Sequence, residues 1–150
     1  MSAAEQLEMF WRLLLALGLG GVIGLEREYR GHEAGVRTNA LVCSGAALFG
    51  AVSLEYGDSR IAAGVVQGVG FLGAGLIFQR GNDVRGITTA ASIWLIAGVG
   101  LLVANDMWLV AILITAVAFL LLELSPLSDA LMRAGYRRRG ESPPEDEDTD

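Results

Sequence analysis

Apolar residues are grouped in five long stretches along the chain, and the charged residues fall in bursts between them. The stretches run from Met9 to Leu25, Thr38 to Leu54, Ile61 to Phe78, Ile87 to Ala104 and Met107 to Leu122. Each approaches the ~20 residues that a helix needs to cross about 30 Å of hydrocarbon. Single spans of this length must be helices, because lipid offers no partners to backbone amides. The pattern therefore predicts an all-α bundle of about five transmembrane helices.

Composition and connections support this architecture. Hydrophobic residues make up 53% of the 150 residues and charged residues only 19%, with a mean hydropathy of +0.48. The short connections EYGDSR and AND predict that the second and third helices, and the fourth and fifth, are tight antiparallel hairpins. We expect residues 1–124 to form the transmembrane domain. Residues 125–150 turn abruptly from basic to acidic, which predicts a cytoplasmic tail without fixed structure.

The distribution of arginine predicts the orientation of the chain in the membrane, since the chain has no lysine. Five spans place Arg12 and Arg60 on one side of the membrane and the other nine arginines on the opposite side. The nine-arginine side should be cytoplasmic, which puts the N-terminus outside. Arg12 lies just inside the first span and can pair with Glu8, one turn earlier. The first apolar stretch shows no convincing cleavage site, so we expect it to remain as a span.

Glycine is concentrated in the third stretch, where the segment QGVGFLGAG holds four glycines in nine residues. The hydrophobic effect does not draw helices together in lipid, and small residues let their backbones pack closely. On a helical wheel Gly64, Gly68 and Gly75 share one face, while Gly70 and Gly73 lie roughly opposite. A helix with glycine on both faces can touch neighbours on both sides. The third helix is therefore predicted to be the centre of the bundle.

Other residues of the apolar stretches bear on packing and on a path for ions. Gly20 and Gly24 in the first stretch and Gly98 in the fourth are expected contact points between helices. An alternative to packing alone is that the third helix unwinds or slides around a path lined by Gln67. The simpler interpretation of Gln67 is a hydrogen bond to another helix.

The second and fourth stretches begin with similar sequence motifs, GVRTNA and GITTAA. Each has threonine near a helix N-terminus, where the hydroxyl can cap free N–H groups. Arginines beside two positive helix ends would favour an anion: a lipid headgroup, a phosphate compound or an acidic segment of a partner. In the simpler alternative, the arginines only obey the positive-inside rule and the threonines only cap. The predicted cytoplasmic cluster comprises Glu26, Arg27, Arg37, Thr38, Arg80, Arg85, Thr88 and Thr89.

Metal binding and catalysis have weak support in the sequence. Magnesium is often held by one or two carboxylates, and Glu26 and Asp83 are weak candidates. Glu26 more simply forms an ion pair at the membrane interface. The single histidine, His32, lies in a charged loop, and the single cysteine, Cys43, is interpreted as a packing residue. No nucleophile, base and acid can be assembled from these residues, so we expect no enzyme, no cofactor and no binding to nucleic acid.

Two segments, GVIGLEREYRGHEAGVRTNALVCSGAALF and QGVGFLGAGLIFQRGNDVRGITTAASIWLIAGVG, resemble the membrane domain of the MgtC/SapB family. The resemblance covers roughly Leu17 to Gly100. It implies a multi-pass protein of the bacterial cytoplasmic (inner) membrane, in a family associated with magnesium limitation, acid stress and survival within hosts. The residues that match the family pattern are Gly24, Glu26, Arg27, Gly35, Arg37, Thr38, Gly68, Gly70, Phe71, Gly73, Ala74, Gly75, Gly86, Thr89, Ala90, Ala91 and Trp94.

The resemblance favours a regulatory or accessory protein that lies in the lipid bilayer and binds another membrane complex, such as the ATP synthase. The alternative is a transporter or channel for magnesium or another ion. It would act as a homo-oligomer, because five short helices leave little room for a path in one protomer. Many members continue into a soluble cytoplasmic domain, and we expect this chain to be a short form without it. Some virulence-linked members carry asparagine where Thr88 stands.

Overall fold

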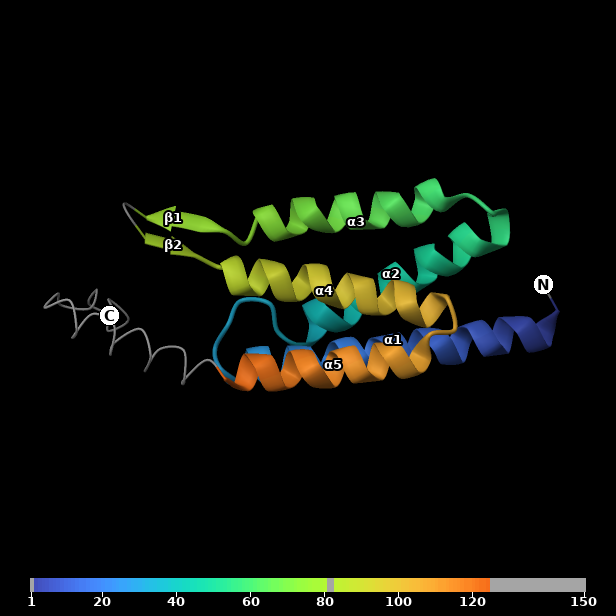
Figure 1. Ribbon diagram of the computed structural model, residues 1–150, viewed down its shortest axis with the longest axis horizontal. Helices are drawn as coiled ribbons and strands as arrows, with labels where there is room; N and C mark the ends of the chain where they lie inside the picture. The colour runs from blue at the N-terminus through green and yellow to red at the C-terminus, as the bar shows by residue number, and fades with distance from the viewer. Residues whose placement is uncertain (1, 81–82, 125–150) are drawn as a thin grey trace, which may run out of the picture. The chain divides into compact units, whose positions relative to one another are not determined.

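The computed structural model of the protein describes residues 2–80 and 83–124 and shows a helical bundle (Figure 1). Its elements are α1 (Ala3–Tyr29), α2 (Val36–Tyr56), α3 (Ser59–Ala74), β1 (Phe78–Arg80), β2 (Asp83–Arg85), α4 (Ile87–Ala104) and α5 (Trp108–Glu123). Residues up to Phe119 form one compact unit, and the end of α5 belongs to a second. The predicted all-α bundle is confirmed. The predicted tail, residues 125–150, lies outside the described residues.

Helix length separates the five predicted spans into two groups. Among the described residues, α1, α2 and α4 are long and apolar enough to cross a membrane. Helices α3 and α5 have 16 residues each, which corresponds to about 24 Å at 1.5 Å per residue. The third span was predicted to reach Phe78, but α3 ends at Ala74. That part of the prediction is wrong, because the chain leaves the helix after Gly75 and enters a hairpin.

The hairpin joins α3 to α4 and was not predicted from the sequence. Strand β1 pairs with β2 in antiparallel register, with Phe78 opposite Arg85. The chain enters α4 through Gly86, whose φ is +85°. A Cβ atom at this position would overlap the carbonyl oxygen of Leu76. Glycine is therefore required at Gly86 both by its backbone conformation and by the space around it.

Helices α2 and α4 form the centre of the bundle, with α1 packed against both. Glycine lets their backbones meet: a Cβ at Gly20 would overlap the carbonyl oxygen of Asn39, and one at Gly100 would overlap that of Cys43. At the other end of α2, a Cβ at Gly50 would lie only 2.8 Å from the Cβ of Ala104. These contacts give the close van der Waals packing that helices in lipid depend on.

The prediction that the third helix is central is wrong. Helix α3 lies along one side of α2 and α4 (Figure 1). All of its residues are described, and only Val69 and Gly73 are buried. Nothing lies within 4 Å of a Cβ placed at Gly64, Gly68 or Gly70, the glycines expected to pack. The glycines are on both faces of α3, as the wheel predicted, but neighbours lie on only one side.

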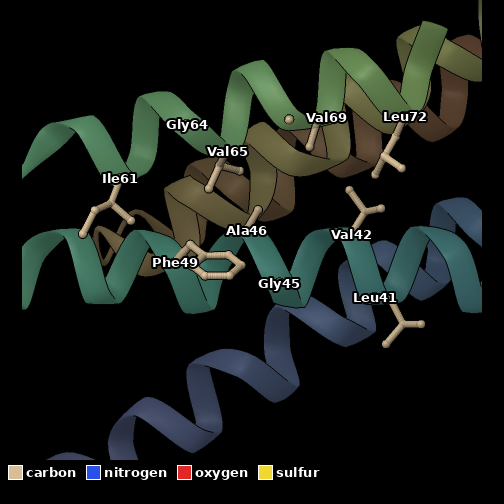
Figure 2. Close-up of a pocket in the computed structure, with 11 residues that line it drawn as sticks. Leu41, Val42, Gly45, Ala46, Phe49, Ile61, Gly64, Val65, Val69 and Leu72 are labelled. Atoms are coloured by element: carbon tan, nitrogen blue, oxygen red, sulfur yellow. The ribbon is translucent and has the colours of Figure 1, made fainter. Parts of the chain in front are cut away.

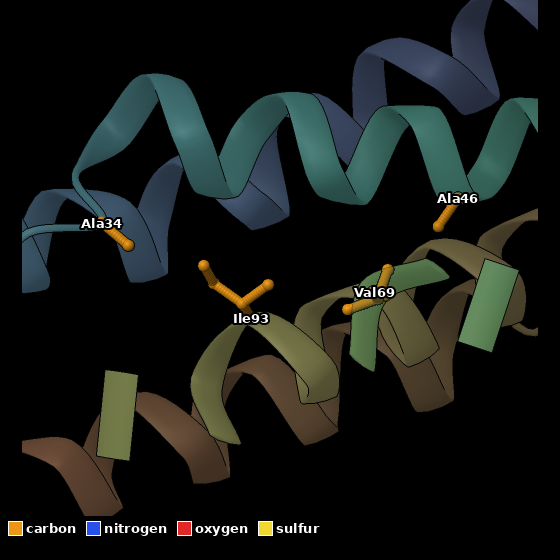
Figure 3. Close-up of a cluster of buried hydrophobic side chains, with 5 residues drawn as sticks. Ala34, Ala46, Val69 and Ile93 are labelled. Carbon is orange, nitrogen blue, oxygen red and sulfur yellow. The ribbon is translucent and has the colours of Figure 1, made fainter. Parts of the chain in front are cut away.

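A small apolar cluster connects α3 to the centre (Figure 3). It contains Val69 of α3, Ile93 and Ala97 of α4, Ala46 of α2 and Ala34 of the α1–α2 loop, all less than 9% exposed. Most of these side chains are alanine or valine, so the helices come close without a large interlocking side chain. Gly73 also meets Ala90 of α4 at ordinary contact distance, where an added Cβ would lie 3.5 Å from the alanine Cβ.

The end of the bundle near the N-terminus is held by Arg12. Its guanidinium pairs with Glu8 at 2.5 Å, as the spacing predicted, and with Asp106 in the α4–α5 turn at 2.8 Å. Asp58 begins α3 by accepting a hydrogen bond from the backbone N–H of Arg60. The charged groups at this end therefore pair largely with one another.

We expect Gly100→Ala to lower the unfolding temperature in detergent by several degrees. The added methyl would push α4 from the carbonyl of Cys43, and such overpacking typically costs about 1–3 kcal/mol. Gly98→Ala is the matched control, because it lies on the same helix with nothing within 4 Å of its Cβ position. Thermal unfolding of both purified variants measures the difference. Equal unfolding temperatures would show that α2 and α4 are not packed as described.

Candidate functional site

Polar side chains are buried at the end of the bundle that we call the arginine-rich end, where α1 ends and α2 and α4 begin. Glu26 is 4% exposed, Arg27 2%, Asn39 0% and Thr89 5%. Charged groups removed from water are costly unless they are paired, and in membrane proteins they are often functional. We therefore take these four side chains, the buried polar cluster, as the candidate site.

Arg27 is buried because of its place on α1. It continues the face made by Ala16, Gly20, Ile23 and Gly24, which packs against the rest of the bundle. Since a Cβ at Gly24 would lie 2.5 Å from the Cα of Val36, α1 and α2 touch just before Arg27. The tight crossing therefore places the guanidinium inside the bundle.

The guanidinium of Arg27 reaches across to α4. Its Nη2 donates a hydrogen bond to Oγ1 of Thr89, a buried contact between residues 62 positions apart. Ser92 donates its hydroxyl to the carbonyl oxygen of Thr89 at 2.8 Å and so completes the local network. Nε of Arg27 has no hydrogen-bond partner among the described residues. One bond to Thr89 thus links α1 to α4 while part of the charged group remains unsatisfied.

Glu26 faces a different neighbour. Its Oε1 lies 2.7 Å from Nε of Arg30, one turn later on α1 and 24% exposed. The two groups meet at ion-pair distance but outside hydrogen-bonding geometry. Neither carboxylate oxygen of Glu26 accepts a hydrogen bond in the described part of the chain. The interfacial ion pair that the sequence favoured for Glu26 is present, and its partner is Arg30.

Asn39 adds a third unsatisfied oxygen acceptor. Its Nδ2 donates to the carbonyl oxygens of Ala34 at 2.7 Å and Gly35 at 3.1 Å, which holds the α1–α2 loop to α2. Its Oδ1 is buried with no partner among the described residues. Buried polar atoms are normally bonded to protein, water or an ion. The oxygens of Glu26 and Asn39 that accept no hydrogen bond among the described residues are therefore the places where a proton donor or a cation would be stabilised.

The structure does not bring the whole predicted cluster together. Arg37, Thr38, Arg85 and Thr88 are exposed, whereas Arg27 and Thr89 meet in the interior. The side chains of Arg80 and Asp83 lie outside the described part of the structure. The cluster that the two similar sequence motifs predicted is thus divided into the buried pair Arg27 and Thr89 and a set of exposed side chains.

The prediction that threonines cap α2 and α4 is wrong. These helices begin after Gly35 and Gly86, and neither N-cap residue makes a side-chain hydrogen bond. At α2 the carboxylate of Glu28 accepts a hydrogen bond from the backbone N–H of Val36 at 2.8 Å. An acidic side chain of the chain itself therefore occupies the positive end where an external anion was expected.

The roles of Asn39, Glu28 and Arg30 were not predicted from the sequence. Asn39 could have been found from helical spacing, because it lies on the same α2 face as the buried residues Cys43, Ala46 and Gly50. Glu28 could not, because its bond to α2 depends on the path of the loop.

Metal and proton chemistry are limited in the described residues. No group of three histidine, cysteine or carboxylate side chains is close enough to hold a metal ion there. His32 is exposed in the α1–α2 loop. Partial burial, and then the charge of Arg27, lower the pKa of His32 below its ordinary value. His32 is therefore neutral near pH 7.

Gln67, proposed for a path, is exposed on α3 and lines no path within the described bundle. Cys43 is fully buried between the α1 and α4 contacts, which fits a packing residue.

Comparison with known proteins adds evidence from sequence. The sequence pattern of the MgtC family matches residues 13–130. Protein MgtC of Salmonella typhimurium strain LT2 is 54% identical over 93 residues, which cover 60% of this chain and 40% of that protein. Protein MgtC of Brucella abortus strain 2308 is 56% identical over 88 residues, or 56% of this chain and 37% of that protein. The match thus spans about two fifths of these relatives' length. No solved structure matches.

We expect Thr89→Val to destabilise the bundle, because it leaves a further nitrogen of buried Arg27 unpaired. Such a loss costs about 1–3 kcal/mol or more for a charged group. Thr88→Val is the matched control, since Thr88 is exposed and its replacement should change the free energy of unfolding by about 0.5 kcal/mol at most. Thermal unfolding in detergent tests both. A Thr88→Val effect as large as that of Thr89→Val would contradict the importance of the Arg27–Thr89 bond.

Proposed function

The chain belongs to the MgtC family, and we propose that it is a regulatory or accessory protein that acts by contact with another membrane protein. The regulation is linked to magnesium limitation or stress adaptation and takes place in the bacterial cytoplasmic membrane. The related proteins carry the name MgtC, and this chain matches less than half of their length.

The observation that carries the proposal is the close contact of the helix backbones at the centre of the bundle. Gly20 meets α2 at Asn39 and Gly100 meets it at Cys43, without room for intervening side chains or water. Ion pathways need polar groups or water along their length. The buried surfaces between α1, α2 and α4 are instead mainly alanine, glycine, valine and isoleucine. This packing supports action by contact over conduction through one protomer.

The buried polar cluster provides a physical link between ionic conditions and helix packing. Glu26 and Asn39 have buried oxygens that accept no hydrogen bond in the described part of the chain, and Arg27 bridges α1 and α4. A proton or cation that reached these oxygens would change the charge balance beside the bridge. The packing of α1 against α2 and α4 would change with it. Such a shift is what a regulatory protein needs in order to alter its contacts with a partner.

The alternative function is an ion path formed between copies of the chain. One observation favours it: Gln67, a polar residue within the apolar α3, is exposed on the surface of the protomer. A path that used Gln67 would therefore have to form between protomers. The two functions differ in whether the purified protein moves ions by itself.

The decisive experiment combines growth and transport. We expect the chain to restore growth at low magnesium to a bacterial strain that lacks its own family member. Proteoliposomes containing the folded, monodisperse protein should show no more magnesium entry, by an internal dye, than protein-free vesicles. Saturable entry that is lost in Glu26→Gln and Arg37→Ala, but kept in Arg60→Ala at the opposite end, would establish transport and overturn the proposal. Failure to restore growth would reject the link to magnesium limitation.

A further inference from the structure

A groove runs between α2 and α3 on the side of the bundle (Figure 2). Its volume is about 580 Å³, and all eleven residues that line it are apolar or glycine. The α2 side includes Leu41, Gly45 and Phe49, and the α3 side includes Ile61, Gly64, Gly68 and Leu72. Helices α2 and α3 are joined by a turn at Gly57, and the groove lies between them beside the contact that Ala46 and Val69 make in the apolar cluster.

Three glycines set the width of this groove. Nothing lies within 4 Å of a Cβ placed at Gly45, Gly64 or Gly68. These glycines are not needed for contact between the helices of the chain, unlike Gly20 or Gly100. They leave a slot that is open to a narrow apolar occupant. The α3 wall extends from Ile61 to Leu72, which corresponds to about 16 Å along a helix axis. One leaflet of a hydrocarbon core is about 15 Å deep, half of the bilayer value.

Charge distinguishes the two ends of the groove. Arg37 lies one helical turn before Leu41, is exposed, and forms no ion pair with the described residues. At the other end Arg60 has Asp58 beside it, with 3.8 Å between Nε and Oδ1. The cation that remains available therefore lies at the arginine-rich end. It suits an anionic group whose apolar part extends along the slot.

We propose that this groove binds one acyl chain of an anionic phospholipid, whose phosphate lies at Arg37. The apolar walls and the leaflet-like length of the groove fit the acyl chain. The guanidinium of Arg37, which has no ion pair within the described ranges, fits the phosphate, with which arginine forms strong charge-assisted hydrogen bonds. A helix of a second copy would need no anion at Arg37, so charge favours the lipid. Lipid binding requires no partner protein, and this inference stands or fails separately from the regulatory function.

The test uses the full-length chain, purified in detergent and titrated with phosphatidylglycerol or with zwitterionic phosphatidylcholine. Native mass spectrometry counts the bound lipids. We expect wild-type protein to retain phosphatidylglycerol in preference to phosphatidylcholine by about tenfold, which corresponds to about 1.4 kcal/mol. Arg37→Gln should abolish this preference, whereas Arg60→Gln at the opposite end should keep it.

Filling the slot provides a second, independent measurement. Gly68→Leu should reduce bound phosphatidylglycerol at least tenfold, because its side chain would occupy the groove. Gly70→Leu is the matched control: it lies on the same helix, lines no part of this groove and also has open space around it. Both variants should fold, which thermal unfolding verifies. Equal lipid binding by the two variants would overturn the proposal. So would a wild-type dimer that Gly68→Leu converts to a monomer, since a second copy would then fill the groove.

Discussion

Close contact between the backbones of α1, α2 and α4 is the constraint on which the rest of the structure depends. Lipid supplies little hydrophobic force to hold helices together, so van der Waals contact and hydrogen bonds must do so. Gly20 and Gly100 bring α1 and α4 against carbonyl groups on α2, with Cys43 beside both crossings. Each crossing holds the backbones closer than any side chain would permit. The three helices are therefore fixed at separations set by glycine.

The buried polar cluster is a consequence of these crossings. Because Gly24 meets the start of α2, Arg27, which lies on the same face of α1 about one turn later, is held inside the bundle. It bonds to Thr89 on α4, while oxygens of Glu26 and Asn39 accept no hydrogen bond among the described residues. Tight packing thus holds an electrostatically costly arrangement in place. At the arginine-rich end, helix packing and the charge of these buried groups are therefore coupled.

Helix α3 follows a different principle. Its glycines do not close a contact, and with Gly45 they keep a groove open toward the membrane. The closed centre and the open side suggest a division of labour. The centre maintains the fold and the buried polar cluster, while the side presents an open apolar groove. The regulatory function proposed above would use both, because it requires a fixed conformation and an accessible surface.

Hydropathy alone was enough to predict the five helices, though not the end of α3, because it reports the local preference of each segment for lipid or water. The sequence by itself also determined the pairing of Arg12 with Glu8, which depends only on helical spacing. It could not determine which glycines pack: Gly68 and Gly100 are both glycines in apolar helices, yet only Gly100 has a helix opposite it. Nor could it show that Glu28, not Thr38, bonds the start of α2, or that Thr89 rather than Thr88 meets Arg27. Those outcomes depend on how distant segments are placed around each residue, and only the tertiary structure decided that.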